Sequence, residues 1–138
     1  MKVRNYKTVT ARFKRLSKQA DLQVRSSIQR NTDQIFDEAI QNVPVEFNYL
    51  RGSGVPNTQN PYKGIVSFGG DAAPYAPYVE FGTGTNVRIP QGFSDFAMQY
   101  FVNGKGTMKA QPYLIPAFIK YRKIFLKDMK QIAKNISK

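Results

Sequence analysis

The sequence predicts an α+β domain, in which a long N-terminal helix and a C-terminal helix flank a small antiparallel β-sheet with long loops. Apolar residues recur at helical spacing from Thr10 to Val43 and again from Pro116 onward. Between these stretches, short apolar runs alternate with glycine and proline, which is typical of strands and turns. Because 138 residues suffice for one modest core, we treat residues 1–138 as a single domain.

The first helix is predicted to begin after a threonine N-cap, either Thr8 or Thr10, which leaves residues 1–9 as a flexible arm. Pro44 ends it, because the residue before a proline is biased towards extended geometry. The stretch is long for a globular helix, and Thr32 could cap a second helix, so we expect a break near that residue.

The middle of the chain predicts three short strands. They cover residues 47–51, 62–68 and 75–81, and the last two form an antiparallel hairpin around a glycine-rich turn. Glycine, proline and asparagine make residues 52–61 an exposed loop.

A second long loop is expected at residues 84–109, with a short helix over 94–102 inside it. The last helix begins at Pro116, since proline suits the first helical position. Phe81 and Phe118 are predicted to be core residues.

The composition argues against an enzyme. The chain has no His, the commonest general base, and no Cys. Gly82-Thr83-Gly84 lacks the third glycine of a dinucleotide fingerprint. We therefore predict no catalytic, metal or cofactor site and no small-molecule substrate.

Glu80 is unusual because it interrupts an apolar run. It could be a buried catalytic acid, a salt-bridge partner of Arg51 or Arg88, or an outward residue of an alternating strand. A catalytic role is the weakest of these readings, since no nucleophile, base or metal ligand accompanies it.

The net charge of +12 is concentrated at the two ends of the chain. The first 20 residues carry seven Lys or Arg and no acid, and the last 34 carry nine with Asp128 as their one acid. Such ends suggest nucleic acid, a membrane surface or an acidic protein face as partner, or a solvated basic surface without a ligand. No apolar run approaches the ~20 residues of a membrane span, and no secretory signal is present, so we expect a soluble protein that is intracellular at synthesis, without a membrane partner.

Three separated segments, taken in order, resemble one protein family. Residues 44–53 look like the Pro-Val-Asp-Thr-Gly-x-Leu-Arg-x-Ser segment of the tail-completion, or head–tail joining, proteins of long-tailed bacteriophages. Residues 75–83, Tyr-Ala-Pro-Tyr-Val-Glu-Phe-Gly-Thr, are similar to that family's Tyr-Ala-x-x-Val-Glu-Phe-Gly-Thr strand. Residues 110–118 resemble its Ala-x-Pro-Phe-Leu-x-Pro-Ala helix start.

The resemblance implies a structural virion protein of the neck, which completes the tail or joins it to the head. It implies a ring of copies, six-fold by analogy with tail symmetry, assembled in the host cytoplasm and contacting the tail tube and connector proteins. Passage of genome DNA through the ring is compatible with such a role. The residues that match the family's motifs, as candidates for holding the fold or for assembly, are Pro44, Leu50, Arg51, Tyr75, Tyr78, Glu80, Phe81, Gly82, Thr83, Pro112, Leu114 and Pro116.

Three alternatives stay open. Within virions, the chain could be a head-side stopper or adaptor. From another class, it could be a basic nucleic-acid-binding protein, which should gather its bases beside its aromatic residues. An enzyme with an unfamiliar site is the third alternative.

Overall fold

The computed structural model describes residues 6–100 and 104–137, with side chains from residue 14 onward. Its elements in chain order are α1 (Tyr6–Asn42), α2 (Asn48–Gly52), β1 (Val55–Asn57), β2 (Ile65–Ser67), α3 (Ala76–Phe81), the 3₁₀ turn η1 (Gly84–Asn86), α4 (Ser94–Met98) and α5 (Ile115–Ile136). The predicted α+β class, with a long first helix, a small antiparallel sheet and a closing helix, is confirmed.

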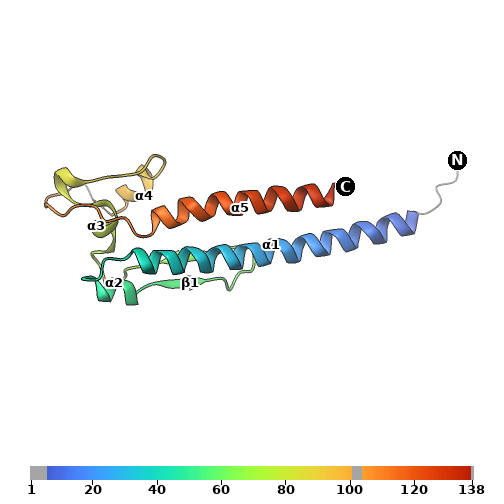
Figure 1. Cartoon of the computed structure of the whole chain (residues 1–138), viewed down its shortest axis with the longest axis horizontal. Helices are drawn as coiled ribbons and strands as arrows, with labels where there is room; N and C mark the ends of the chain where they lie inside the picture. The colour runs from blue at the N-terminus through green and yellow to red at the C-terminus, as the bar shows by residue number, and fades with distance from the viewer. Residues whose placement is uncertain (1–5, 101–103, 138) are drawn as a thin grey trace.

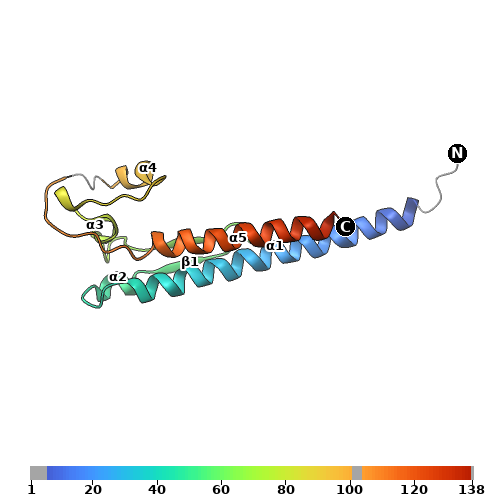
Figure 2. The same cartoon turned by 45° about the horizontal axis from the view of Figure 1, so that its top comes forward.

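The chain is elongated (Figure 1). Helices α1 and α5 run side by side in opposite directions and form what we call the shaft, and the strands lie along α1 (Figures 1 and 2). Helices α2, α3 and α4, with their connecting segments, gather at one end of the shaft as the head. At the other end, α1 continues beyond the end of α5.

Helix α1 is continuous, so the predicted break near Thr32 is wrong. The Thr32 hydroxyl donates to the carbonyl of Ile28 at 2.6 Å, and the Asn31 amide donates to the carbonyl of Ser27 at 2.8 Å. Both polar side chains thus bond back to the preceding turn instead of capping a new helix. The helix does end before Pro44, as predicted.

The start of α1 also differs from the prediction. The helix begins at Tyr6, ahead of both threonines expected as caps. Residues 6–9 of the predicted arm are therefore helical, and residues 1–5 lie outside the described part of the chain.

The sheet consists of β1 and β2, paired antiparallel with Val55 opposite Ser67 and Asn57 opposite Ile65. β2 falls within the predicted strand at 62–68, but its predicted partner is wrong. The partner lies inside the predicted loop at 52–61, where turn chemistry brings the chain back: the Asn60 side chain accepts from the backbone N–H of Tyr62 at 2.9 Å.

The other two predicted strands, 47–51 and 75–81, are wrong because they form helices α2 and α3. Short apolar runs do not distinguish a strand from a buried helical turn. In α3, Pro77 occupies the first turn, where its missing N–H costs nothing. Val79, Glu80 and Phe81 are buried in succession, which an alternating strand would not allow.

The predicted loop at 84–109 contains η1 and α4. α4 confirms a short helix at the start of the range expected over 94–102; residues 99 and 100 form a turn, and 101–103 lie outside the described residues. Helix α5 begins at Ile115, with Pro116 in its first turn, in agreement with the predicted start.

Two buried clusters hold the head against the shaft. One joins Val43, Leu50, Val79 and Tyr113, together with Ala73 and Ala76. The other joins Phe81, Ala97 and Ile115. Phe81 is a core residue as predicted, but Phe118 is 38% exposed and is not one. Within the described residues, no helix is long and apolar enough to cross a membrane.

Candidate assembly site

The three segments that resemble the neck-protein family meet in the head. Leu50 of the first, Val79 of the second and Tyr113 of the third pack in one buried cluster. The guanidinium of Arg51 donates to the carbonyl of Val43 at 3.1 Å and so ties the first segment to the end of α1. The segments, far apart in sequence, are therefore neighbours in space.

Glu80 joins the second segment to the third. Its Oε2 accepts hydrogen bonds from the backbone N–H groups of Tyr113 at 3.0 Å and Leu114 at 2.9 Å, and its Oε1 accepts from Ile115 at 3.0 Å. These are N–H groups at the start of α5, which lack partners within the helix. A carboxylate there also lies at the positive end of the helix dipole.

The surroundings of Glu80 decide between the sequence readings. The residue is only 5% exposed, so the outward orientation is wrong. The two arginines proposed as partners bond elsewhere: Arg51 donates to Val43, and Arg88 donates to the carbonyl of Val87 at 2.9 Å. Burial raises the pKa of Glu80, while its hydrogen bonds from the α5 backbone oppose that rise. The carboxylate therefore serves as a structural cap.

Gly82 and Thr83 fix the exit from α3. Gly82 has φ of 79°, and a Cβ there would lie 2.5 Å from the carbonyl oxygen of Asn86. The next residue pairs with Met108: the N–H of Thr83 donates to the Met108 carbonyl at 2.9 Å, and the Met108 N–H donates to Thr83 Oγ1 at 2.8 Å. Gly82 therefore lets the chain leave α3 at an angle that a Cβ would hinder.

The remaining motif residues surround this scaffold. Tyr75 is half-buried and packs against Phe47, with ring centroids 5.7 Å apart. Tyr78 packs against the Phe81 cluster, and Leu114 packs against the Leu50 cluster. Of the twelve motif residues, eight are not buried. Two are exposed, Pro112 and Pro116, and six are half-buried: Pro44, Arg51, Tyr75, Tyr78, Thr83 and Leu114. The motifs thus mainly hold the head together.

An open apolar surface lies elsewhere, along the shaft. Two adjoining hollows of about 420 and 320 Å³ share four residues and form one groove between α1, the β1–β2 hairpin and α5. We call this the shaft groove; the residues that matter below are Ile28, Thr32, Ile35, Tyr62, Gly64, Ile65, Phe118, Phe125 and Leu126.

The groove is walled by side chains that stay in contact with solvent. On the hairpin, Ile65 is 42% exposed; on α5, Phe118 and Leu126 are 38% and 51% exposed. The guanidinium of Arg122 lies 5.5 Å from the centre of the Phe118 ring, which places a cation at the rim. Contiguous exposed apolar side chains of this kind are typical of a surface that binds another chain.

The hairpin wall is held in place by contacts with α1. The Tyr62 hydroxyl donates to Asp21 at 2.6 Å, and the Thr58 hydroxyl donates to the Gln29 side chain at 2.7 Å. At Gly64 the hairpin backbone comes so close to Thr32 that a Cβ would overlap its side chain. The width of the groove is therefore set by direct packing of the hairpin on α1.

Sequence reasoning missed this groove because it placed Phe118 in the core. A signal was available: the apolar positions of the last helix, from Phe118 to Ile136, spread over a wider arc than one partner helix covers. The apolar side chains of α5 that α1 does not cover form the exposed wall of the shaft groove.

Within the described residues, no three His, Cys, Asp or Glu side chains lie close enough to hold a metal ion. Comparisons of the chain with protein-family models, with curated proteins and with solved structures find no match.

Proposed function

We propose that this protein is a structural subunit of a long-tailed phage virion, which forms a ring at the neck and completes the tail or joins it to the head. The three-segment resemblance supports the assignment. The spatial convergence of those segments supports it further, because residues matching one family's motifs are expected to share a structural task.

The observation that carries the proposal is the shaft groove. A single chain leaves Ile65, Phe118 and Leu126 open to water along one side of the shaft. Burying such side chains against another subunit contributes about 25 cal/mol per Å² of apolar surface removed from water. A head-to-tail contact through this groove generates a ring when the rotation between neighbours closes.

Light scattering of the purified chain, alone and mixed with purified tail tubes, tests the proposal. The chain offers a matched pair of variants. Leu126 in the groove wall and Leu22 on α1 outside the groove are both helical leucines, 51% and 52% exposed. We expect Leu126→Asp to abolish assembly and Leu22→Asp to preserve it.

A chain that stays monomeric and ignores tail tubes at every salt concentration would refute the ring. If both leucine variants assemble equally, the groove is not part of the interface.

Two alternatives have their own tests. A head-side stopper or adaptor would be located by electron microscopy of intact particles carrying a labelled copy of the chain, on the head side of the joint instead of the tail side. A sequence-selective nucleic-acid-binding protein would bind its target tightly at physiological salt in the presence of competing DNA.

A further inference from the structure

A row of lysines runs along α5. Lys120, Lys123, Lys127, Lys130 and Lys134 follow one another at steps of three, four, three and four residues, and all five are exposed. At 3.6 residues per turn this spacing places them within an arc of about 80° on one face of the helix. With a rise of 1.5 Å per residue, the row is about 21 Å long.

Four of these charges are uncompensated. Lys120 is paired with Glu38 of α1 at 3.0 Å, and within the described residues no acidic side chain pairs with the other four. The acid within α5, Asp128, is turned to α1, where Ser27 donates to it at 2.7 Å and Arg30 at 2.6 Å. Like charges three and four residues apart destabilise a helix, so the row opposes the stability of the element that carries it.

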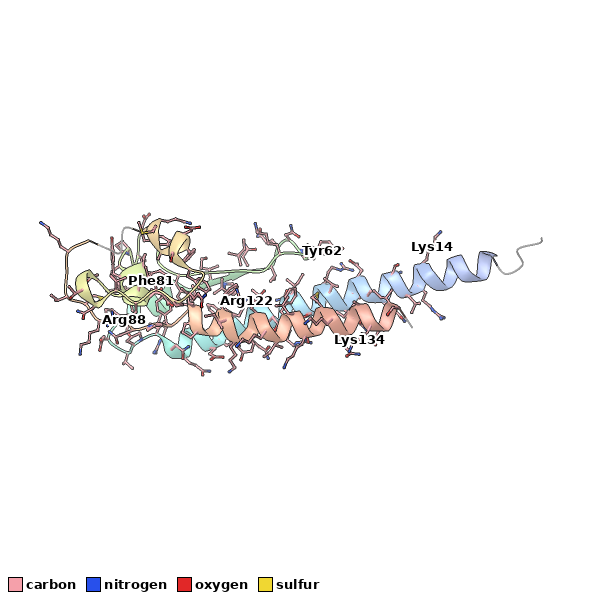
Figure 3. The ribbon with its side chains drawn as sticks, turned by 90° about the horizontal axis from the view of Figure 1, so that it is seen from above. Lys14, Tyr62, Phe81, Arg88, Arg122 and Lys134 are labelled. Carbon is pink, nitrogen blue, oxygen red and sulfur yellow. The ribbon has the colours of Figure 1, made fainter. Side chains whose placement is uncertain are left out.

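The row is separate from the shaft groove. Three large apolar side chains of α5, Phe118, Phe125 and Leu126, line the groove. In Figure 3, Tyr62 at the groove and Lys134 in the row lie on opposite sides of the shaft. The two surfaces are therefore available to two different partners at once.

The side chains in and around the lysine row indicate which class of ligand it could bind. A membrane-surface helix needs large apolar side chains to insert beside its bases, and the largest of those on α5, Phe118, Phe125 and Leu126, line the groove instead. Binding of single strands relies on aromatic rings interleaved with the basic residues. On α5 such rings stand beside Lys120 (Tyr121, 5.1 Å) and Arg122 (Phe118, 5.5 Å), outside the four lysines without an acidic partner. B-DNA presents one negative charge per about 1.7 Å of its axis, so a row of flexible ammonium groups about 21 Å long lies within reach of several phosphates.

We propose that the lysine row of α5 binds the phosphate backbone of duplex DNA without reading its sequence, through the four lysines that have no acidic partner. The proposal adds a partner to the function proposed above and does not depend on ring formation, since it concerns a different face of the shaft.

The test is a titration of the full chain with a fluorescent duplex longer than the row, by anisotropy, between about 50 and 200 mM salt. One variant replaces Lys123, Lys127, Lys130 and Lys134 with Gln. The control variant replaces Lys14, Arg15, Lys18 and Arg88 with Gln. These are four exposed bases on α1 and in the head, outside the groove, so the net charge changes equally. Circular dichroism checks that both variants fold.

Binding through four phosphates makes log K fall with log salt at a slope near −3.6, because each contact contributes about −0.9. We expect the row variant to lose this slope nearly completely, the control variant to change it by less than about one unit, and unrelated duplex sequences to bind alike.

Three results would overturn the proposal. Equal losses in both variants would show that net charge alone attracts DNA. If the wild-type chain does not bind the duplex at the lowest salt concentration, DNA is excluded as its ligand. Displacement of the DNA by polyglutamate at equal charge concentration would assign the row to an acidic protein surface. Light scattering of the row variant tests ring formation separately from DNA binding. The four substitutions should leave ring formation intact.

Discussion

Glu80 and Ile115, 35 positions apart in the chain, are joined by a hydrogen bond of 3.0 Å from the backbone N–H of Ile115 to Oε1 of Glu80. With the bonds from Tyr113 and Leu114 to Oε2, this contact fixes where α5 begins and how it leaves the head. The Glu80 carboxylate of the head is therefore bonded directly to the start of the shaft helix α5.

Glu80→Gln should destabilise the fold. The glutamine amide keeps one acceptor oxygen but turns an NH₂ donor towards backbone N–H donors, so buried N–H groups lose their acceptor. We expect a loss of about 1–3 kcal/mol in the free energy of unfolding, measured by chemical denaturation. The exposed Glu46→Gln is the control and should stay within about 0.5 kcal/mol of wild type. Equal stability of the two variants would show that Glu80 is not a structural cap.

Phe81 and Phe118 should separate folding from assembly. Phe81 is buried, so Phe81→Ala should lower the free energy of unfolding by about 3–5 kcal/mol, measured by denaturant titration. Phe118 lies in the groove wall, so Phe118→Ala should cost less than half as much in the monomer but reduce assembly in light scattering. A Phe118→Ala chain that loses stability like Phe81→Ala would place Phe118 in the core after all.

Gly82→Ala should cost more stability than Gly70→Ala. Both glycines have positive φ, 79° and 76°, so alanine is strained at either position, and at Gly82 the ψ of −178° adds a backbone conformation that essentially only glycine adopts. A Cβ at Gly82 also meets backbone atoms of Asn86 and Ala110, whereas a Cβ at Gly70 meets nothing within 4 Å. Thermal denaturation of the two variants measures the combined cost of the close approach and of the backbone conformation at Gly82. Equal melting temperatures of the Gly82→Ala and Gly70→Ala variants would contradict this prediction.

Asp128→Asn should destabilise the shaft in a pH-dependent way. The hydrogen bond from Ser27, followed by those from Asn31 and Arg30, lowers the pKa of Asp128 below its ordinary value of 3.8. The ionised form is thus favoured in the folded state, and its contribution is present above pH 3.8 and is lost as pH falls through the lowered pKa.

At neutral pH we expect Asp128→Asn to cost about 1 kcal/mol, with the gap to wild type closing in strong acid. Denaturation at both pH values, with the exposed Asp37→Asn as control, measures it. A gap that is the same at both pH values would exclude ionisation of Asp128 as its source.

The long helices could be predicted from the sequence because their signals are local. Apolar spacing marks their extent, and Pro44 and Pro116 mark where one ends and the other begins. The hairpin could not, since β1 consists of Val55, Pro56 and Asn57, all exposed and without the alternation that marks a half-buried strand.

The candidate site likewise combines a feature that the sequence reveals with contacts that it does not. Glu80 is conspicuous in the sequence as an acid within an apolar run, but its partners are backbone groups more than 30 positions away, which no local pattern encodes. The groove likewise depends on where the hairpin rests against α1. Gly64 permits that contact, and its role is visible only beside Thr32.

Tyr113 gives the molecule a mechanical property. Its carbonyl accepts from the side chain of Asn42 at the end of α1, its N–H donates to Glu80 of α3, and its hydroxyl donates to the carbonyl of Ala76 at 3.3 Å. One residue therefore links the end of one shaft helix, the start of the other and the head between them. A force applied along either helix should be transmitted through this junction to the head, so we expect the shaft and the head to turn together as one rigid body.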